Sequence, residues 1–191
     1  MAPYVSNRGA SNEWGTVKEM ATLTLLSVEE YLRLPPREDG VSDELIDGEI
    51  VLSPSAKPLH AKIVRRLMKL LEPLESRGYE LGKDFGCILG EYSLPGPDFA
   101  AIASQRWNNL GQDEYLQGAP ELVVEVFSPA NRRGLMAQKA ALYLQHGAKA
   151  VWVVYPKKQT VVVHDAEGET EFRCGEGLEF SGVRIPVSDI F

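Results

Sequence analysis

Residues 121–127 read Glu-Leu-Val-Val-Glu-Val-Phe, a nearly continuous apolar run. Such a run is expected of a central strand that is covered on both faces, because a strand with one wet face would alternate apolar and polar residues. A second apolar run, Ala150 to Tyr155, follows a predicted helix at about 134–146 that stops at Gly147. These two runs predict the middle of a sheet with helices packed on it.

The rest of the chain extends this pattern in both directions. Ser27-Val28-Glu29-Glu30 matches a capping box and predicts a short helix that ends before Pro35-Pro36. Alternation around Asp47-Gly48 predicts a hairpin at 44–53. A long helix is expected at 58–76, a polar loop at 104–119, and strands at 79–82, 86–93, 97–103, 160–164, 169–174 and 179–185. The fold class is therefore α/β, with a mixed central sheet flanked by helices.

Length and composition fit one domain. The chain has 191 residues with 44% hydrophobic and 25% charged residues, ordinary globular values. We expect a flexible polar tail at 1–22, which lacks the apolar segment of a signal peptide, and a single domain at 23–191. No apolar run approaches the ~18 residues of a membrane span. Cys87 and Cys174 belong to no CxxC pair, so a reducing, cytoplasmic location is expected.

Basic residues are unevenly distributed in this acidic chain. The net charge of −7 argues against broad nonspecific affinity for nucleic acid. Two windows, 50–71 and 126–164, nevertheless contain no acid and hold eleven of the 20 basic residues. Each could simply be a solvated face. The alternative is a surface for phosphates, and the candidates are Lys62, Arg65, Arg66 and Lys69 on one face of the long helix, with Arg132 and Arg133.

Three charged residues fall where apolar residues are expected. Glu125 interrupts the apolar run at 121–127, and Asp98 heads a strand that continues as Phe99-Ala100-Ala101-Ile102. Lys139 lies at the centre of the apolar face of the helix at 134–146. A carboxylate in such a place is costly unless it is paired or binds metal. One arrangement satisfies all three: two carboxylates hold a divalent cation, and the lysine reaches the same place.

Each of these charges also has a structural reading. An isolated carboxylate is more often part of a salt bridge than a metal ligand, and a long lysine stem can carry its amine out to solvent. His60, on the apolar side of the long helix, and Glu49, in the hairpin, are weaker candidates. A helix histidine is usually a core residue with satisfied hydrogen bonds, and Glu49 could be an ordinary exposed strand carboxylate.

Taken in order, these motifs resemble a known family. Residues 23–191 resemble the Uma-type restriction endonucleases of the PD-(D/E)XK nuclease superfamily. The matching pieces are Glu44-Leu45-Ile46-Asp47-Gly48-Glu49, Pro54-Ser55 with His60, Pro97-Asp98, Leu122 to Pro129, Lys139 with Tyr143 and Gly147, and Val151-Trp152-Val153-Val154. Each piece is short, but their order and spacing together are specific.

The resemblance implies a restriction-endonuclease-like core and assigns roles. Asp98 is implied to be the aspartate of the PD pair and Glu125 the second metal carboxylate, with Mg²⁺ or Mn²⁺ as the cofactor. The superfamily's lysine position, two residues after the glutamate, holds Phe127 here, and Lys139 is implied to replace it. Glu49 and His60 match the family's early acidic residue and histidine. Asn131-Arg132-Arg133-Gly134 departs from the pattern, which has an acidic residue before the helix.

The leading functional hypothesis is metal-dependent hydrolysis of DNA phosphodiester bonds, with Asp98, Glu125, Lys139, Glu49 and His60 as the catalytic candidates. The expected partner is DNA rather than a membrane, and a homodimer stays an open alternative. Two rival hypotheses are an inactive nuclease-fold module that binds nucleic acid or a protein, and a hydrolase that acts on another phosphoester. Fold analogy alone does not choose a substrate.

Overall fold

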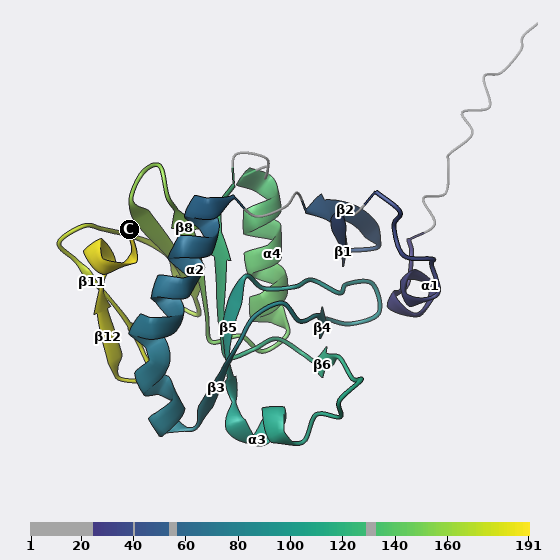
Figure 1. The fold of residues 1–191 in the computed structure, drawn as a ribbon, viewed down its shortest axis with the longest axis horizontal. Coiled ribbons are helices and arrows are strands. Elements are labelled where there is room, and N and C mark those ends of the chain that lie inside the picture. The colour runs from purple at the N-terminus through teal and green to yellow at the C-terminus, as the bar shows by residue number, and fades with distance from the viewer. Residues whose placement is uncertain (1–24, 40, 54–56, 129–132) are drawn as a thin grey trace, which may run out of the picture.

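The computed structural model describes residues 25–39, 41–53, 57–128 and 133–191. Its centre is a six-stranded mixed sheet in the order β10-β9-β8-β7-β5-β3 (Figure 1). Neighbouring strands of this sheet are antiparallel except for the parallel pair β7 and β8. The strands are β3 Tyr79–Gly82, β5 Phe99–Ala103, β7 Leu122–Val126, β8 Ala150–Tyr155, β9 Thr160–Asp165 and β10 Gly168–Arg173. The predicted α/β class with a mixed central sheet is confirmed.

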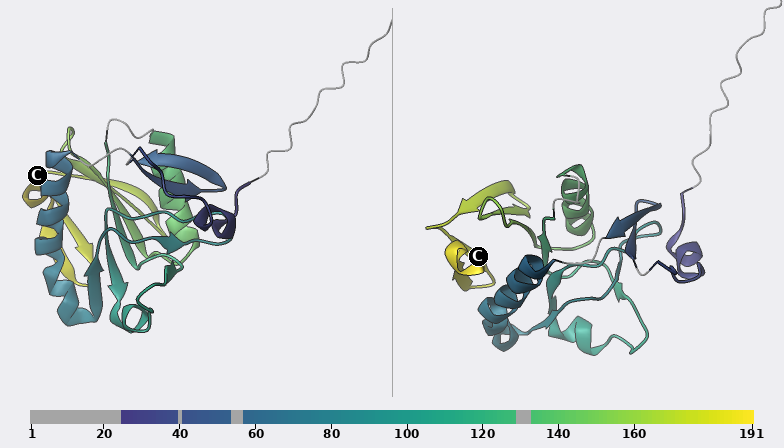
Figure 2. Two further views of the ribbon diagram at one scale, coloured as in Figure 1. Left: turned by 45° about the vertical axis from the view of Figure 1, so that its right-hand side comes forward. Right: turned by 45° about the horizontal axis from the view of Figure 1, so that its top comes forward.

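Helices cover both faces of the sheet, as the apolar run at 121–127 predicts (Figure 2). Helix α2, Pro58–Leu71, packs against one face in a core that includes Val124 and Val126 of β7. Helix α4, Arg133–Gln145, packs against the other face in a core that includes Val123. Because successive side chains of a strand point to opposite faces, Glu125 lies on the same face as Val123, towards α4.

A hairpin and a short helix form a third, smaller cluster beside the sheet. The strands β1, Ser42–Ile46, and β2, Glu49–Ser53, turn at Asp47 and Gly48, both with positive φ. This geometry suits an Asp-Gly hairpin turn. Helix α1, Val28–Leu32, begins with the predicted capping box, and its Val28 forms a cluster with Leu45 of β1 and with Leu94. Both local predictions are confirmed.

The long helix is shorter than the sequence suggested. Helix α2 ends at Leu71 and continues as a 3₁₀ helix, η1, over Glu72–Arg77. Pro73 explains the change, because it has no N–H to donate to the carbonyl four residues earlier. Gly78, with φ of 85°, then ends the segment.

The prediction of a strand at 86–93 is wrong for most of its length. The observed strand, β4, covers only Cys87–Ile88 and pairs with β6, Leu116–Gln117. Beyond it the Leu89 N–H donates to the Ser93 carbonyl oxygen across a turn in which Gly90 has φ of 74°. The predicted loop at 104–119 likewise contains ordered elements, namely β6 and helix α3, Ser104–Asn108.

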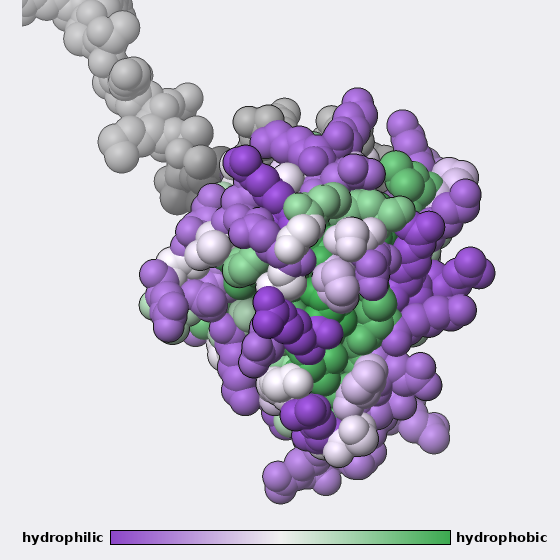
Figure 3. All heavy atoms as spheres, turned by 90° about the vertical axis from the view of Figure 1, so that its left-hand side faces the viewer, coloured by the Kyte–Doolittle hydropathy of each residue, from purple (hydrophilic) through white to green (hydrophobic). Residues whose placement is uncertain are grey.

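The C-terminal segment forms a second hairpin rather than one strand at 179–185. Strand β11, Gly177–Phe180, pairs with β12, Val183–Pro186, and the 3₁₀ helix η2, Val187–Ile190, follows. Figure 3 shows the side of the molecule on which these C-terminal elements lie, with an apolar area among hydrophilic side chains. Phe172 and Phe191 pack against the core that contains Val124 and are only partly buried.

The predicted tail at 1–22 lies outside the described residues. Among the helices that the structure describes, none has both the length and the apolar composition required to cross a membrane.

Candidate active site

A cavity of about 950 Å³ opens where β7 and β8 end. Its walls come from the β1–β2 hairpin, the start of α2, the segment before β5, the end of β7, α4 and the turn after β8. All five residues predicted as catalytic candidates line it, namely His60, Glu49, Asp98, Glu125 and Lys139. Open α/β sheets commonly bind ligands at the carboxyl ends of their strands, and this cavity lies at such an edge.

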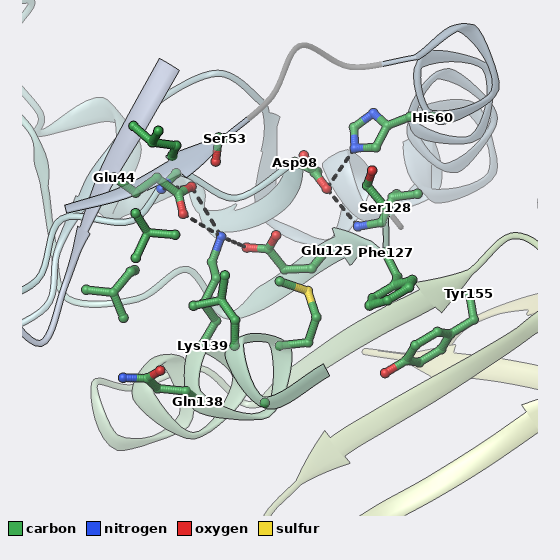
Figure 4. A pocket seen from close by; sticks show the side chains of 18 of the residues that line it. Glu44, Ser53, His60, Asp98, Glu125, Phe127, Ser128, Gln138, Lys139 and Tyr155 are labelled. Atoms are coloured by element: carbon green, nitrogen blue, oxygen red, sulfur yellow. Dashed lines mark hydrogen bonds and ion pairs between the residues drawn. The ribbon is translucent and has the colours of Figure 1, made fainter. Parts of the chain in front are cut away.

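Lys139 is held between two carboxylates (Figure 4). Its Nζ lies 2.7 Å from Oε1 of Glu125, and 3.0 and 3.2 Å from the two oxygens of Glu44. The Lys139 and Glu125 side chains are 4% and 5% exposed. The lysine therefore does not extend to solvent. It ends in a buried ion pair, which explains why a charged residue is accommodated on the apolar face of α4.

Further hydrogen bonds fix both carboxylates. The Tyr143 hydroxyl donates to Oε1 of Glu125 over 3.1 Å, and the Gly96 N–H donates to Oε1 of Glu44 over 3.0 Å. Burial and the nearby carboxylates hold the pKa of Tyr143 well above its usual value, so the phenol stays a donor. The Leu94 N–H donates to the Leu45 carbonyl, which ties β1, and with it Glu44, to the segment before β5.

Asp98 lies beside this group and is held by two donors. The Val126 N–H donates to its Oδ2 over 2.7 Å, and Nε2 of His60 lies 2.9 Å from the same oxygen. Because Phe99 pairs with Val124, one further step of the antiparallel register places Asp98 next to Glu125. The hydrogen bond to Asp98 raises the pKa of His60, which favours the protonated imidazolium.

The site brings three carboxylates together with one lysine and one histidine. Desolvation raises the pKa of Glu125, Lys139 lowers it, and Asp98 and Glu44 raise it further. Desolvation lowers the pKa of Lys139, but its two carboxylate partners outweigh this and raise it. Lys139 therefore stays protonated, whereas burial and the neighbouring carboxylates raise the pKa of Glu125 and favour its protonated form.

Comparison with known proteins identifies the family. The model of the Uma2 family, described as "Putative restriction endonuclease", matches residues 28–184. The chain belongs to the Uma2 family. A crystal structure of "a putative nuclease" from Anabaena variabilis ATCC 29413 resembles this chain with a TM-score of 0.75 and 21% sequence identity, covering 87% of this chain and 97% of that one. This likeness confirms a nuclease-like fold. No curated protein matches the chain.

In this Uma2 chain the donor set suits a hard divalent cation. Lys139 and Tyr143 both contact Oε1 of Glu125, whereas Val126 and His60 both contact Oδ2 of Asp98. Within the described residues, no group of three or more His, Cys, Asp or Glu side chains has the arrangement of a complete metal site, so these two carboxylates would supply only part of the coordination. Mg²⁺ commonly binds through one or two carboxylates, with water and phosphate completing its coordination. Asp98 and Glu125 fit that pattern.

The structure also places residues that the sequence analysis did not single out. Glu44 contacts Lys139, whereas Glu49 is exposed and lines the cavity, so a role for Glu49 stays a prediction. Glu44 and Glu49 both belong to the hairpin motif that resembles the family. The alternating pattern of the hairpin does not show which of the two carboxylates points towards Lys139. The cavity is also lined by Lys57, Lys157 and Lys158. These lysines belong to the two acid-free windows at 50–71 and 126–164, but the sequence did not indicate that they lie at the cavity.

The residues predicted to bind nucleic acid lie elsewhere. Lys62, Arg65, Arg66 and Lys69 are exposed on α2 but do not line the cavity. Arg66 donates to the backbone carbonyl of Phe191. At 1.5 Å per residue, Lys69 lies roughly 14 Å further along the helix axis than His60. The structure does not describe residues 129–132 or the side chain of Arg133. The predicted roles of Arg132 and Arg133 therefore lie outside the described residues.

Proposed function

We propose that this Uma2 chain is a Mg²⁺-dependent endonuclease that hydrolyses DNA phosphodiester bonds. The observation that carries the proposal is a cluster of three carboxylates at the edge of a nuclease-like sheet, in which Glu44 and Glu125 share the buried Lys139 and Asp98 lies beside Glu125. Buried charges of this kind are costly to keep for stability alone, since apolar residues of similar size often serve as well. Three carboxylates beside an open cavity are, however, a donor set that a divalent cation can use.

In this proposal Asp98 and Glu125 would hold the cation, which would polarise the phosphoryl group and make a bound water more acidic. Hydrolysis forms a bond between the water oxygen and phosphorus, breaks the bond to one sugar oxygen, and returns a proton to the leaving oxygen. Lys139 keeps its proton and neutralises charge that develops on the phosphate. Glu44 orients the Lys139 amine, and His60 orients Asp98 through its 2.9 Å contact.

The cleavage test uses supercoiled plasmid and circular single-stranded DNA, with Mg²⁺, Mn²⁺ or EDTA. We expect cleavage with either metal, none in EDTA, and a loss of at least about a hundredfold in Asp98→Asn, because a neutral ligand holds the cation poorly. Asp113→Asn, an exposed carboxylate outside the main cavity, serves as the matched control. DNA binding without cleavage in any metal would favour an inactive module, and cleavage that Asp98→Asn leaves unchanged would contradict the assignment.

We also propose that the exposed basic residues of α2 contact the DNA backbone away from the reacting phosphate. Counterion release makes such binding fall steeply with salt, by about one unit of log–log slope for each phosphate contact. The variant Lys62→Glu/Arg65→Glu should therefore weaken binding and flatten its salt dependence, as measured by anisotropy of a labelled oligonucleotide. Arg66 is left unchanged because it holds the C-terminal segment. An unaltered salt slope would remove α2 from the interface.

A further inference from the structure

Two aromatic side chains form one end of the cavity, beyond the charged group. Phe127 follows β7 and Tyr155 ends β8, and their ring centroids lie 5.1 Å apart with an angle of 34° between the planes (Figure 4). The Phe127 N–H donates to the Val154 carbonyl, so the parallel pairing of β7 and β8 continues to this point. The two rings therefore lie side by side at the sheet edge.

Their position relative to the candidate metal ligands is set by the strand. Phe127 lies two residues after Glu125 and so on the same face of β7. Two residues of a strand span about 6.6 Å, so the aromatic pair lies within the reach of one nucleotide from the candidate ligands. A nucleotide whose phosphate lies at Asp98 and Glu125 would thus place a neighbouring base at the aromatic pair.

The two rings differ from the aromatic residues of the core. Tyr143 and Trp152 are almost completely buried, whereas Phe127 and Tyr155 are only partly buried and line the cavity. Each of the two rings therefore contacts both the core and the cavity.

Positive charge accompanies the aromatic pair. Lys157 and Lys158, in the turn after β8, are exposed and line the same cavity. Nζ of Lys158 lies 5.7 Å from the centre of the Tyr155 ring. Aromatic faces flanked by cations are the common means of binding single-stranded nucleic acid, because every base has a flat face and every nucleotide a phosphate.

We propose that Phe127 and Tyr155, with Lys157 and Lys158, bind an unpaired base next to the reacting phosphate, so that the preferred substrate is single-stranded DNA. This inference rests on the proposed function and specifies its substrate class. Within a duplex both faces of a base are covered by its neighbours, so a base reaches the aromatic pair only when it is unpaired or displaced from the stack.

The test measures binding of a 2-aminopurine-labelled oligonucleotide, single-stranded or annealed, in EDTA, so that hydrolysis plays no part. We expect the single strand to bind at least tenfold more tightly than the duplex and its fluorescence to be quenched on binding. Phe127→Leu and Tyr155→Leu should each weaken single-strand binding about tenfold and reduce the quenching. Tyr155→Phe keeps the ring and should retain both.

Matched controls separate stacking from general effects. Tyr92→Leu removes an exposed aromatic outside the cavity and should change neither readout. Lys158→Ala should weaken binding, whereas Lys149→Ala, which removes the lysine near Tyr79, should not. Equal affinity for single strand and duplex, or unchanged binding in both leucine variants, would overturn the inference while leaving the proposed nuclease activity in place. Absence of binding and of metal-dependent cleavage for every DNA would overturn both.

Discussion

Replacing Lys139 with methionine should lower the free energy of unfolding by about 3–5 kcal/mol, the usual cost of breaking a buried ion pair. Methionine suits the apolar face of α4, but it leaves Glu44 and Glu125 without their shared cation. The expected drop in melting temperature is roughly 6–20 °C for a domain of this size. DNA cleavage should fall at least about a hundredfold, because a charge that stabilises the transition state is lost.

Thermal melting of the wild type, Lys139→Met and Lys139→Met/Glu125→Gln at pH 8 tests this expectation. The double variant should recover part of the lost stability, since it leaves one buried carboxylate fewer without a partner. Lys149→Met, at an exposed lysine, is the control and should melt close to the wild type. A Lys139→Met variant as stable as the wild type would show that Lys139 does not stabilise the Glu44 and Glu125 carboxylates. It would contradict the buried ion pair described above.

Glu125→Gln should have the opposite effect on stability and the larger effect on catalysis. A glutamine side chain can still accept hydrogen bonds from Tyr143 and Lys139, but it removes the charge that faces Asp98 and Glu44. We therefore expect a fold at least as stable as the wild type in the absence of metal. Cleavage should fall about a thousandfold or more, since a metal-stabilised charge is worth several kcal/mol in the transition state.

The stability difference should depend on pH in a defined direction. Burial raises the pKa of Glu125, so this residue contributes most to stability when protonated, and the contribution is lost as the pH rises through its folded-state pKa. Glu125→Gln cannot lose that proton. Its advantage in melting temperature over the wild type should therefore be small near pH 5 and grow towards pH 8. If the melting-temperature advantage of Glu125→Gln shrinks as the pH rises, the folded protein stabilises the ionised form of Glu125, contrary to this prediction.

Most of the fold could be predicted from the sequence, because the patterns that determine its main strands and turns are local. The apolar run of β7 predicts a strand covered on both faces, and Asp47-Gly48 predicts a turn with positive φ; both are observed. The failures come from residues whose structure depends on distant partners. The hydrogen bond between Leu89 and Ser93 around Gly90 is not evident from residues 86–93 alone, and the predicted strand was therefore too long.

The sequence predicted those residues of the candidate site that are charged where the local pattern calls for apolar residues. Glu125 and Lys139 occupy apolar positions, and the structure places them 2.7 Å apart. Glu44 breaks no pattern, since a carboxylate in a hairpin strand is ordinary, and only the tertiary packing of β1 brings it to Lys139. Phe127 and Tyr155 were likewise unremarkable in apolar strands until the parallel register placed them side by side.

The most direct test of the central claim, that Asp98 and Glu125 form a divalent-cation site, is calorimetric titration of the metal-free protein with Mn²⁺ or Mg²⁺ at pH 8. We predict saturable binding by the wild type and by Asp113→Asn, and binding at least about tenfold weaker in Asp98→Asn and Glu125→Gln. Affinity should also decrease at pH 6, because a proton competes for Glu125, whose pKa is raised by burial. Equal affinity in the wild type and Asp98→Asn would contradict the account.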